Sequence, residues 1–132
     1  MKNTLKDDHY CFVCGEQNPS GLHLRFSLQD GKVRTEFIPQ KIHQGYKDII
    51  HGGLISTLLD EAMVKAALMQ GMPSVTAEIT VRFKNPLKVG EKAMVEAVIE
   101  KTHKKIIETS AVMLKTDNTI IAEAHAKLLR QD

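Results

Sequence analysis

The sequence of 132 residues contains few aromatic side chains and no strong excess of charge of either sign. Aromatic residues make up 5% of the chain, tryptophan is absent, and the formal net charge is only +2. The basic residues are spread along the chain, apart from a group at Lys101, Lys104 and Lys105. A nucleic-acid binder of this size usually combines a basic cluster with aromatic residues that stack on bases. We therefore expect no nucleic-acid partner.

Long hydrophobic runs are also missing, and the chain has only two cysteines. No apolar run approaches the roughly 20 residues needed to cross a bilayer, and the first eight residues lack the apolar stretch of a signal peptide. Cys11 and Cys14 are the only cysteines, which is too few for the disulfide framework of a small secreted domain. We therefore expect no membrane association and a cytoplasmic location.

The remaining composition is that of an ordinary globular protein. Hydrophobic residues make up 42% of the chain and charged residues 26%. The length suits one domain with a real core, and we find no internal repeat or low-complexity tract. We therefore expect a single domain over residues 1–132, in which residues 1–21 form a polar lead-in with a Cys-x-x-Cys loop.

Hydrophobic periodicity predicts two strands followed by one long helix. Apolar and polar residues alternate over residues 22–28, a turn signal stands at Asp30-Gly31, and a second strand is predicted over residues 32–38. Residues 54–69 are apolar around most of a helical circumference, so the helix they form must be buried on nearly every side.

The part of the sequence after this helix predicts further strands separated by short turns. The predicted strands cover residues 75–84, 93–101, 105–115 and 119–130. Short connections predict antiparallel neighbours, and one helix with several antiparallel strands is an α+β arrangement. Because the helix is too apolar to lie on an open surface, we expect the sheet to curl around it.

The start of the predicted helix carries residues suited to chemistry on a carbonyl group. Gly52 and Gly53 stand where backbone N–H groups are unpaired and lie at the positive end of the helix dipole. Such amides stabilise an oxyanion well, and glycine lets a substrate approach the backbone closely. Asp60, two turns further along the helix, is the candidate nucleophile or general base.

These residues, in this order, resemble the hot-dog-fold thioesterase superfamily, specifically the PaaI-like acyl-CoA thioesterases. The resemblance rests on Ile50-His51-Gly52-Gly53 and on Leu58-Leu59-Asp60-Glu61-Ala62-Met63, and it covers the chain from about Cys11 to Leu129. Cys11-Phe12-Val13-Cys14-Gly15 with Asn18-Pro19-Ser20-Gly21-Leu22 is similar to one subset of that group. The resemblance implies a hot-dog fold and hydrolysis of an acyl-CoA to free acid and CoA, with no metal or organic cofactor.

The resemblance also implies roles for individual residues. The Gly53 amide polarises the substrate carbonyl, Asp60 attacks it or activates water, and His51 orders the loop by hydrogen bonding. Thr76 matches a Ser or Thr that comes from the partner subunit in similar enzymes and positions the water. The site then lies between protomers, which implies a homo-oligomer, either a dimer or a dimer of dimers.

Substrate binding is assigned to four further residues. Gly52 belongs to the helix start, and Gln44 matches an Asn or Gln that some relatives place before the His-Gly-Gly triplet. Arg82 and Lys84 follow the helix on a predicted strand, where they either meet the phosphates of CoA or belong to a solvated face of the sheet.

Two other functions compete with hydrolysis. One is a hot-dog dehydratase acting on acyl thioesters, which uses a different His/Asp pattern. The other is a non-catalytic acyl-CoA-binding or regulatory hot-dog domain, in which Asp60 is a solvated helix carboxylate. Glu61, next to Asp60, points elsewhere on the helix and is expected to be structural.

The Cys-x-x-Cys pair raises the question of a metal. Cys11 and Cys14 supply two of the four ligands of a structural zinc, and His9 and His23, or a dimer partner, are the candidates to complete the set. A redox role is disfavoured because the pair lies outside a thioredoxin-like βαβ setting. The preferred interpretation is a local turn with partly buried thiols and no metal.

Overall fold

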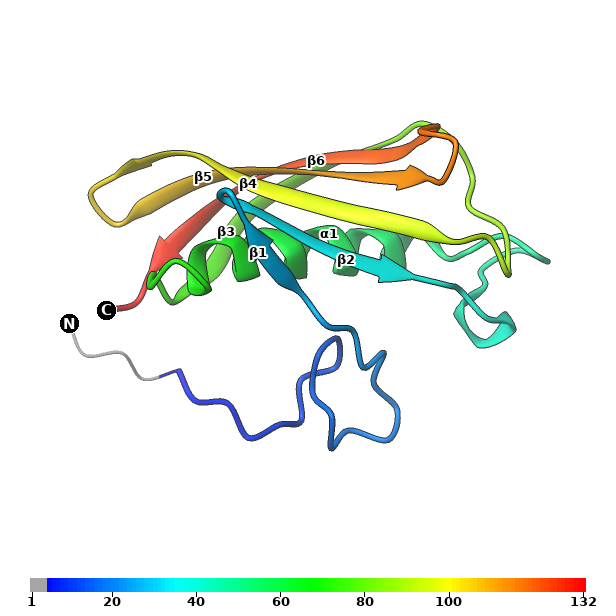
Figure 1. Cartoon of the computed structure of the whole chain (residues 1–132), viewed down its shortest axis with the longest axis horizontal. Helices are drawn as coiled ribbons and strands as arrows, with labels where there is room; N and C mark the ends of the chain where they lie inside the picture. The colour runs from blue at the N-terminus through cyan, green and yellow to red at the C-terminus, as the bar shows by residue number, and fades with distance from the viewer. Residues whose placement is uncertain (1–4) are drawn as a thin grey trace.

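The computed structural model describes residues 5–132, and it consists of one antiparallel sheet curled around one long helix. The six strands lie in the order β1-β2-β4-β5-β6-β3. The helix, α1 (Gly52–Leu68), crosses the concave side of this sheet (Figure 1). The predicted α+β hot-dog architecture is therefore confirmed. The first four residues of the predicted lead-in lie outside the described residues.

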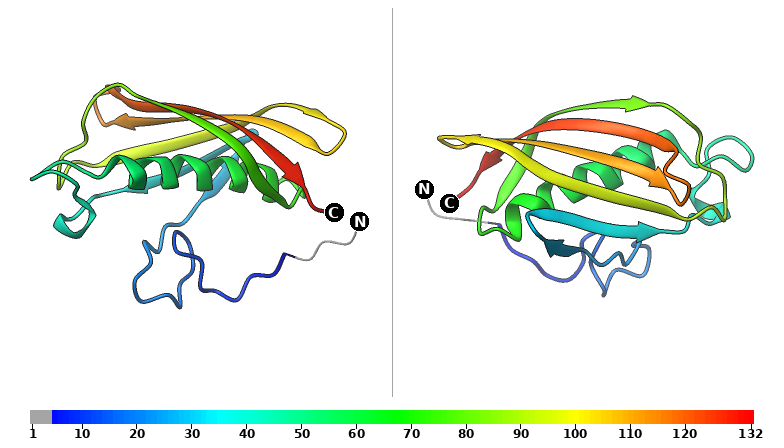
Figure 2. Two further views of the ribbon diagram at one scale, coloured as in Figure 1. Left: turned by 180° about the vertical axis from the view of Figure 1, so that it is seen from behind. Right: turned by 45° about the horizontal axis from the view of Figure 1, so that its top comes forward.

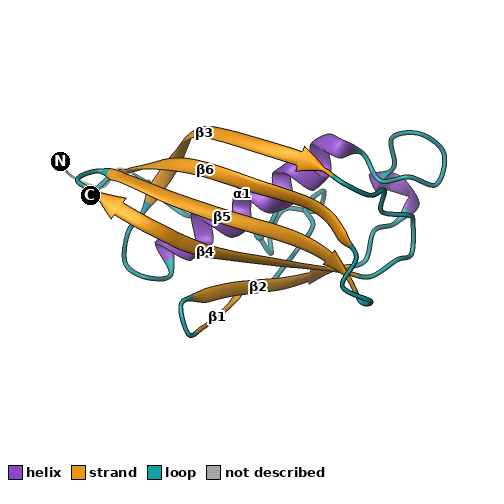
Figure 3. Cartoon of the chain, turned by 90° about the horizontal axis from the view of Figure 1, so that it is seen from above, coloured by secondary structure: helices purple, strands orange, loops and turns teal. Residues whose placement is uncertain are grey.

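The sheet has six strands: β1 (Ser27–Gln29), β2 (Lys32–Phe37), β3 (Ser74–Phe83), β4 (Ala93–His103), β5 (Ile106–Lys115) and β6 (Ile120–Arg130). The bounds of β2 to β6 are similar to those predicted, and β1 differs from its prediction. Figure 3 shows β1 and β2 at one edge of the sheet and β3 at the other. Asp30 and Gly31 both have positive φ, 52° and 75°, as the tight hairpin turn between β1 and β2 requires.

The prediction of a strand over residues 22–28 is wrong for most of its length. Only Ser27 and Leu28 of that segment belong to β1. His23 has a φ of +54°, which interrupts an extended strand. The amides of Leu22 and Leu24 instead bond to carbonyls of the preceding loop, at Phe12 (2.8 Å) and Val13 (2.9 Å). The alternation was real, because apolar side chains of this segment pack on the core.

Helix α1 ends in a turn that depends on a glycine. Gly71 has a φ of +84° and its amide bonds to Leu68, while the amide of Met72 bonds to Ala67. This pair of bonds closes the helix in a Schellman motif, which needs a residue that accepts positive φ. The helical face toward the sheet is fully buried, at residues such as Leu58, Leu59, Ala62 and Met63.

The layers place the N-terminal segment on the side of α1 that the sheet leaves open. Figure 1 and the left view of Figure 2 show this segment, in blue, beneath the helix, with the strands above. The opposite, convex face of the sheet carries surface ion pairs such as Lys32–Glu96 at 3.2 Å. Among residues 5–132, no helix is long and apolar enough to cross a membrane.

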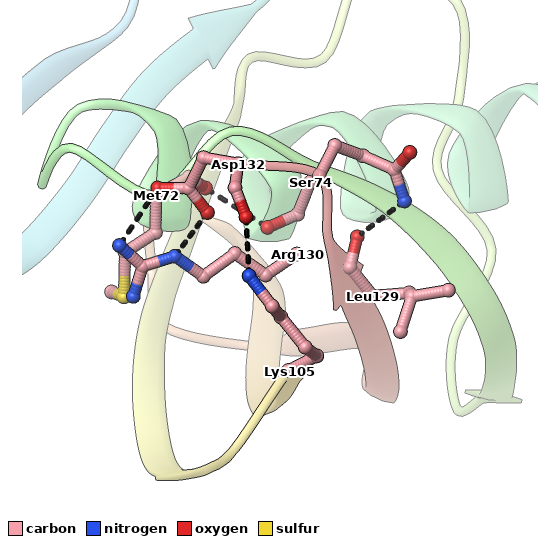
Figure 4. A network of polar contacts seen from close by, with 7 residues as sticks. Met72, Ser74, Lys105, Leu129, Arg130 and Asp132 are labelled. Atoms are coloured by element: carbon pink, nitrogen blue, oxygen red, sulfur yellow. Dashed lines mark hydrogen bonds and ion pairs between the residues drawn. The ribbon is translucent and has the colours of Figure 1, made fainter. Parts of the chain in front are cut away.

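The C-terminal residues close the end of the fold where α1 turns into β3 (Figure 4). The guanidinium of Arg130 pairs with the Asp132 carboxylate, and Lys105 from the β4–β5 turn donates to the Asp132 carbonyl. The amide of Gln131 bonds to the carbonyl of Pro73 at 2.9 Å. The last residues thereby connect the β4–β5 turn with the start of β3.

Candidate active site

In the first turn of α1, some backbone N–H groups have a hydrogen-bond acceptor among residues 5–132 and one does not. His51 caps the helix, and its Nδ1 accepts the amide of Gly53 at 2.9 Å. The amides of Leu54 and Ile55 bond to the His51 carbonyl at 3.0 and 3.2 Å. Within the described chain no acceptor is found for the Gly52 amide, which also has no partner available inside the helix. Gly52 is therefore the residue whose N–H remains open to a ligand.

This arrangement bears on the two glycines in different ways. The predicted oxyanion donor, the amide of Gly53, is engaged by the His51 side chain, which instead fits the predicted loop-ordering role of His51. A Cβ at Gly53 would lie 3.0 Å from the His51 ring, whereas a Cβ at Gly52 would make ordinary contact with the Phe83 ring at 3.5 Å. Phe83 was not predicted as a site residue, because only the packing of β3 on α1 brings it there.

The loop before α1 is held by its own backbone. The amide of His51 bonds to the His43 carbonyl at 3.0 Å, and the amide of Gly45 bonds to Ile49 at 2.8 Å. The side chain of Gln44 accepts the Asp48 amide at 3.1 Å, so its carbonyl oxygen is used within the loop. These bonds fix the direction from which the chain enters the helix.

A recess of about 510 Å³ lies directly before the helix start. It is lined by the Gly45–Tyr46 turn, by Ile49 and Ile50, and by His51 and Gly52. Tyr46 at its edge has 87% of its surface exposed. The open amide of Gly52 thus borders a recess with apolar side chains, which is the setting in which an acyl thioester carbonyl can be held.

The side chain of His43 also holds this loop in place. Its Nδ1 accepts the amide of Gln40 at 2.9 Å, and its ring lies against Phe37 with the centroids 5.2 Å apart. Burial lowers the pKa of His43 below its ordinary value. The ring is therefore neutral at neutral pH, as an accepting Nδ1 requires.

Asp60 forms a close pair with Thr76. The hydroxyl of Thr76 donates to Oδ1 of Asp60 at 2.5 Å, and both side chains are half-buried. Strict alternation along β3 would place Thr76 on the same face as Glu78 and Arg82. The strand register shifts between Thr76 and Glu78, and this bulge turns Thr76 toward the helix.

The two ends of the candidate machinery are far apart within one chain. Gly52 and Asp60 are separated by eight residues of α1. At a rise of about 1.5 Å per residue, this separation is about 12 Å along the helix axis. One thioester carbonyl cannot contact both groups of the same chain, whereas the Asp60 carboxylate and the Thr76 hydroxyl lie together within one chain.

Arg82 and Lys84 lie away from the helix start. Both residues are exposed, Arg82 pairs in register with Glu123 of β6, and Nζ of Lys84 lies 3.7 Å from that glutamate. Val81, the residue before Arg82 on β3, packs against the core. Successive residues of a strand point to opposite faces of the sheet. Arg82 therefore faces the convex side of the sheet, and a contact with the recess at Gly52 is not made within one chain.

A second group of polar side chains lies on another side of α1. Sγ of Cys11 and Cys14 and a carboxylate oxygen of Glu61 all lie within 4.8 Å of one another. His9 and His23, the predicted additional ligands, are not part of this group: His9 lies near Asp7 and Glu16, and His23 contacts the carbonyl of Asn18 at 2.6 Å. The third donor comes from the helix, 47 residues after Cys14 in the sequence.

Comparison with known proteins gives the same family at each level. A model of the thioesterase superfamily matches residues 47–122, a range that contains His51, Gly52, Asp60 and Thr76. Acyl-coenzyme A thioesterase 13 of Homo sapiens is 31% identical over 107 residues, which cover 78% of this chain and 76% of that protein.

Two solved structures share the fold. The E. coli PaaI protein from the phenylacetic acid degradation operon has a TM-score of 0.77 at 20% identity, covering 83% of this chain and 80% of that one. A Streptococcus mutans protein bound to acetyl CoA has a TM-score of 0.77 at 17% identity, covering 81% of this chain and 87% of that one. The family model over residues 47–122, the human relative and these two structures together show that the chain belongs to the thioesterase superfamily and is a thioester hydrolase of hot-dog fold.

Proposed function

We propose that this thioester hydrolase cleaves an acyl-CoA into a free acid and CoA. The observation that carries the proposal is the open amide of Gly52 at the start of α1, beside a recess of about 510 Å³. The activity named for the human relative and the acetyl CoA bound to the Streptococcus mutans protein support the choice of CoA thioesters. A cytoplasmic location remains a prediction that cell fractionation tests.

The oxyanion that develops on the thioester carbonyl is assigned to the Gly52 amide. This N–H lies at the positive end of α1 and has no acceptor within the described chain. The sequence had assigned this role to Gly53, but the Gly53 amide already donates to His51. Gly53 and His51 then hold the helix start in place, and Gly53 contributes its amide only when the His51 ring moves away.

Asp60 supplies the attack, either directly on the carbonyl carbon or by taking a proton from water. Thr76 donates to Oδ1, which fixes the orientation of the carboxylate and leaves Oδ2 for the reaction. In the direct route the carboxylate displaces the CoA thiolate and forms an acyl-Asp60 anhydride, which water then hydrolyses to the free acid and the regenerated carboxylate. In the general-base route Asp60 takes a proton from the attacking water, the C–S bond breaks, and that proton passes to the leaving thiolate. Gln44 is assigned to substrate binding through its side-chain amide, because its carbonyl oxygen is held by Asp48.

The active unit is proposed to be at least a dimer. The distance of about 12 Å between Gly52 and Asp60 along α1 is too long for both to act on one carbonyl. In a two-fold dimer with the helices antiparallel, the Gly52 amide of one chain faces the partner subunit's Asp60. A dimer of dimers contains two such pairs and four equivalent sites.

Arg82 and Lys84 are proposed to contact the phosphates of CoA from the exposed part of the sheet. In the described chain Arg82 has no ion pair, so its charge is available to a phosphate. Arg82→Ala is expected to raise KM severalfold and to leave kcat nearly unchanged. Unchanged KM would remove Arg82 from the substrate site.

The release of free CoA from short, long and aromatic acyl-CoAs tests the proposed reaction. Wild-type protein is expected to release CoA from at least one of them, and Asp60→Asn is expected to lose nearly all of this activity. Equal rates for the two proteins would remove Asp60 from the mechanism. Binding without release by the wild type would support a non-catalytic binding domain instead.

Mixing two inactive variants tests the shared site. In a dimer of one Asp60→Asn chain and one Gly52→Val chain, one site keeps an intact Gly52 and an intact Asp60 from opposite chains. Random mixing makes half of the dimers mixed, each with one of two sites intact, so about a quarter of wild-type activity is expected to return. No recovery in mixed dimers would place both groups of each site in one chain.

A further inference from the structure

We propose that Cys11, Cys14 and Glu61 form a zinc site that fastens the N-terminal loop to helix α1. This site is separate from the residues assigned to catalysis and does not depend on the proposed reaction. It gives a role to the Cys-x-x-Cys motif, whose cysteines are not assigned to any step of thioester hydrolysis.

The loop is built to hold the two thiols in one place. The amide of Gly15 bonds to the carbonyl of Cys11 at 2.9 Å. A Cβ at Gly15 would lie 2.2 Å from the Cys11 nitrogen, so no other residue fits this turn. Val13, between the cysteines, is buried in the core and its carbonyl accepts the Leu24 amide. Both thiols are thereby directed toward α1.

The distances match those between ligands of one zinc ion. Sγ of Cys11 lies 3.5 Å from Oε2 of Glu61, and the donor atoms of all three residues lie within 4.8 Å of one another. Zinc binds thiolate at about 2.3 Å and carboxylate at about 2.0–2.2 Å, so tetrahedral ligands stand about 3.5–3.8 Å apart. A small closure of the three side chains completes this geometry.

The charges also suit a divalent cation with an affinity for sulfur. Two thiolates and one carboxylate carry three negative charges, and Lys65, one turn after Glu61, adds one positive charge. Zn²⁺ makes the group neutral as a whole. Thiolate ligands favour zinc over calcium or magnesium.

A redox role for the pair fits less well. The pair lies in the N-terminal loop and not in a thioredoxin-like βαβ setting, where a redox-active Cys-x-x-Cys pair is found. Both thiols are free in the structure, and a metal ion binds cysteine in its thiolate form.

The fourth ligand position faces a cavity of about 300 Å³. The cavity borders Cys11, Cys14, Glu61 and Lys65, and its wall includes Val64 and Pro73. We assign this position to water, which gives the open arrangement of three protein ligands and one water and not the closed set of four protein ligands. The zinc then ties the loop to the helix that carries Asp60.

Metal binding by the full-length chain tests the site. Metal-free protein is titrated with Zn²⁺ against a chelating indicator, and Co²⁺ is added separately as a spectroscopic probe. One equivalent of Zn²⁺ per chain is expected, and Co²⁺ is expected to give thiolate-to-cobalt charge-transfer bands with the intense visible bands of a tetrahedral site. Absence of zinc binding, or a cobalt spectrum without thiolate bands, would overturn the proposal.

Variants separate this ligand set from the alternatives. Glu61→Gln is expected to weaken zinc binding at least tenfold and to abolish the rise in Tm that zinc gives the wild type. The control variants Glu16→Gln and His9→Ala/His23→Ala are expected to bind zinc as the wild type does. Unchanged affinity in Glu61→Gln, or loss of binding in the histidine variant, would refute the assignment of Glu61. Zinc titration of the Glu61 and histidine variants tests the site even if Cys11→Ser or Cys14→Ser prevents folding.

Discussion

Asp60 and Glu61 are neighbours in the sequence, yet they belong to two different regions of the molecule. The side chain of Asp60 points to β3, where the Thr76 hydroxyl bonds to it at 2.5 Å. The side chain of Glu61 points to the N-terminal loop, where the Cys11 thiol lies 3.5 Å from its carboxylate. Successive helical residues diverge by about 100°, so two identical functional groups receive different partners. The partner of a carboxylate, and not its charge, decides which chemistry it can perform.

The largest expected effect comes from removing the carboxylate on the β3 side. Asp60→Asn preserves the size of the side chain and its hydrogen bond with Thr76, but it removes the nucleophile or base. We expect kcat to fall about a thousandfold, with zinc affinity within about threefold of the wild type. Steady-state CoA release and zinc titration measure the two quantities. A variant that loses zinc and keeps its rate would exchange the roles assigned to the two regions.

The next effect separates the two glycines at the helix start. A methyl group at Gly52 makes ordinary contact with Phe83, so Gly52→Ala is expected to fold normally. The variant keeps the backbone N–H, but the methyl group stands where the substrate must approach it, so kcat/KM is expected to fall by up to about a hundredfold, as on loss of one oxyanion donor. A methyl group at Gly53 lies 3.0 Å from the His51 ring, so Gly53→Ala is expected to lose about 1 kcal/mol of stability by disturbing the cap. Thermal unfolding and kinetics on both variants decide between them. A greater loss of rate in Gly53→Ala would return the oxyanion role to Gly53.

A smaller effect is expected from the hydroxyl that orients Asp60. Thr76→Ala leaves the carboxylate without its partner, and kcat is expected to fall about tenfold with little change in KM. Thr76→Ser keeps the hydroxyl and is expected to restore most of the rate. Equal rates for the alanine and serine variants would show that the hydroxyl has no part in positioning Asp60.

The smallest expected effect concerns the pH dependence of the loop before α1. Burial lowers the pKa of His43, so the folded state binds this proton more weakly than the unfolded chain. Its contribution to stability is therefore complete above the unfolded pKa of about 6.5 and is lost as the pH falls toward the folded pKa. We expect Tm to fall less between pH 7.5 and pH 5.5 in His43→Gln than in the wild type. Identical falls in Tm would exclude His43 as the source.

The sequence predicted those elements whose causes are local. The helix over residues 54–69 was correct to within two residues, because its apolar surface and Gly71 determine its burial and its end. The hairpin at Asp30-Gly31 follows from residues that accept positive φ. The strand over residues 22–28 was wrong because alternation reports which side chains are buried and not what the backbone pairs with.

The candidate site was predictable in its residues but not in its contacts. Asp60 and the glycines could be found because they stand at fixed spacings along one helix. The pairing of Thr76 with Asp60 depends on a bulge in β3, and alternation by itself placed Thr76 on the opposite face. Phe83 and Glu61 were missed as partners of Gly52 and Cys11, since neither has a signal within its own segment.

The sequence by itself determined one buried helix, a curled antiparallel sheet and an acid at a set distance from two glycines, because helical and strand periods are local properties of the chain. Only the tertiary structure decided which amide remains open, which hydroxyl meets Asp60 and which carboxylate completes the cysteine pair. Those outcomes depend on side chains from distant segments, such as β3 and the N-terminal loop, meeting at one helix. Contacts of that kind are set by packing in three dimensions and leave no periodic trace in the sequence.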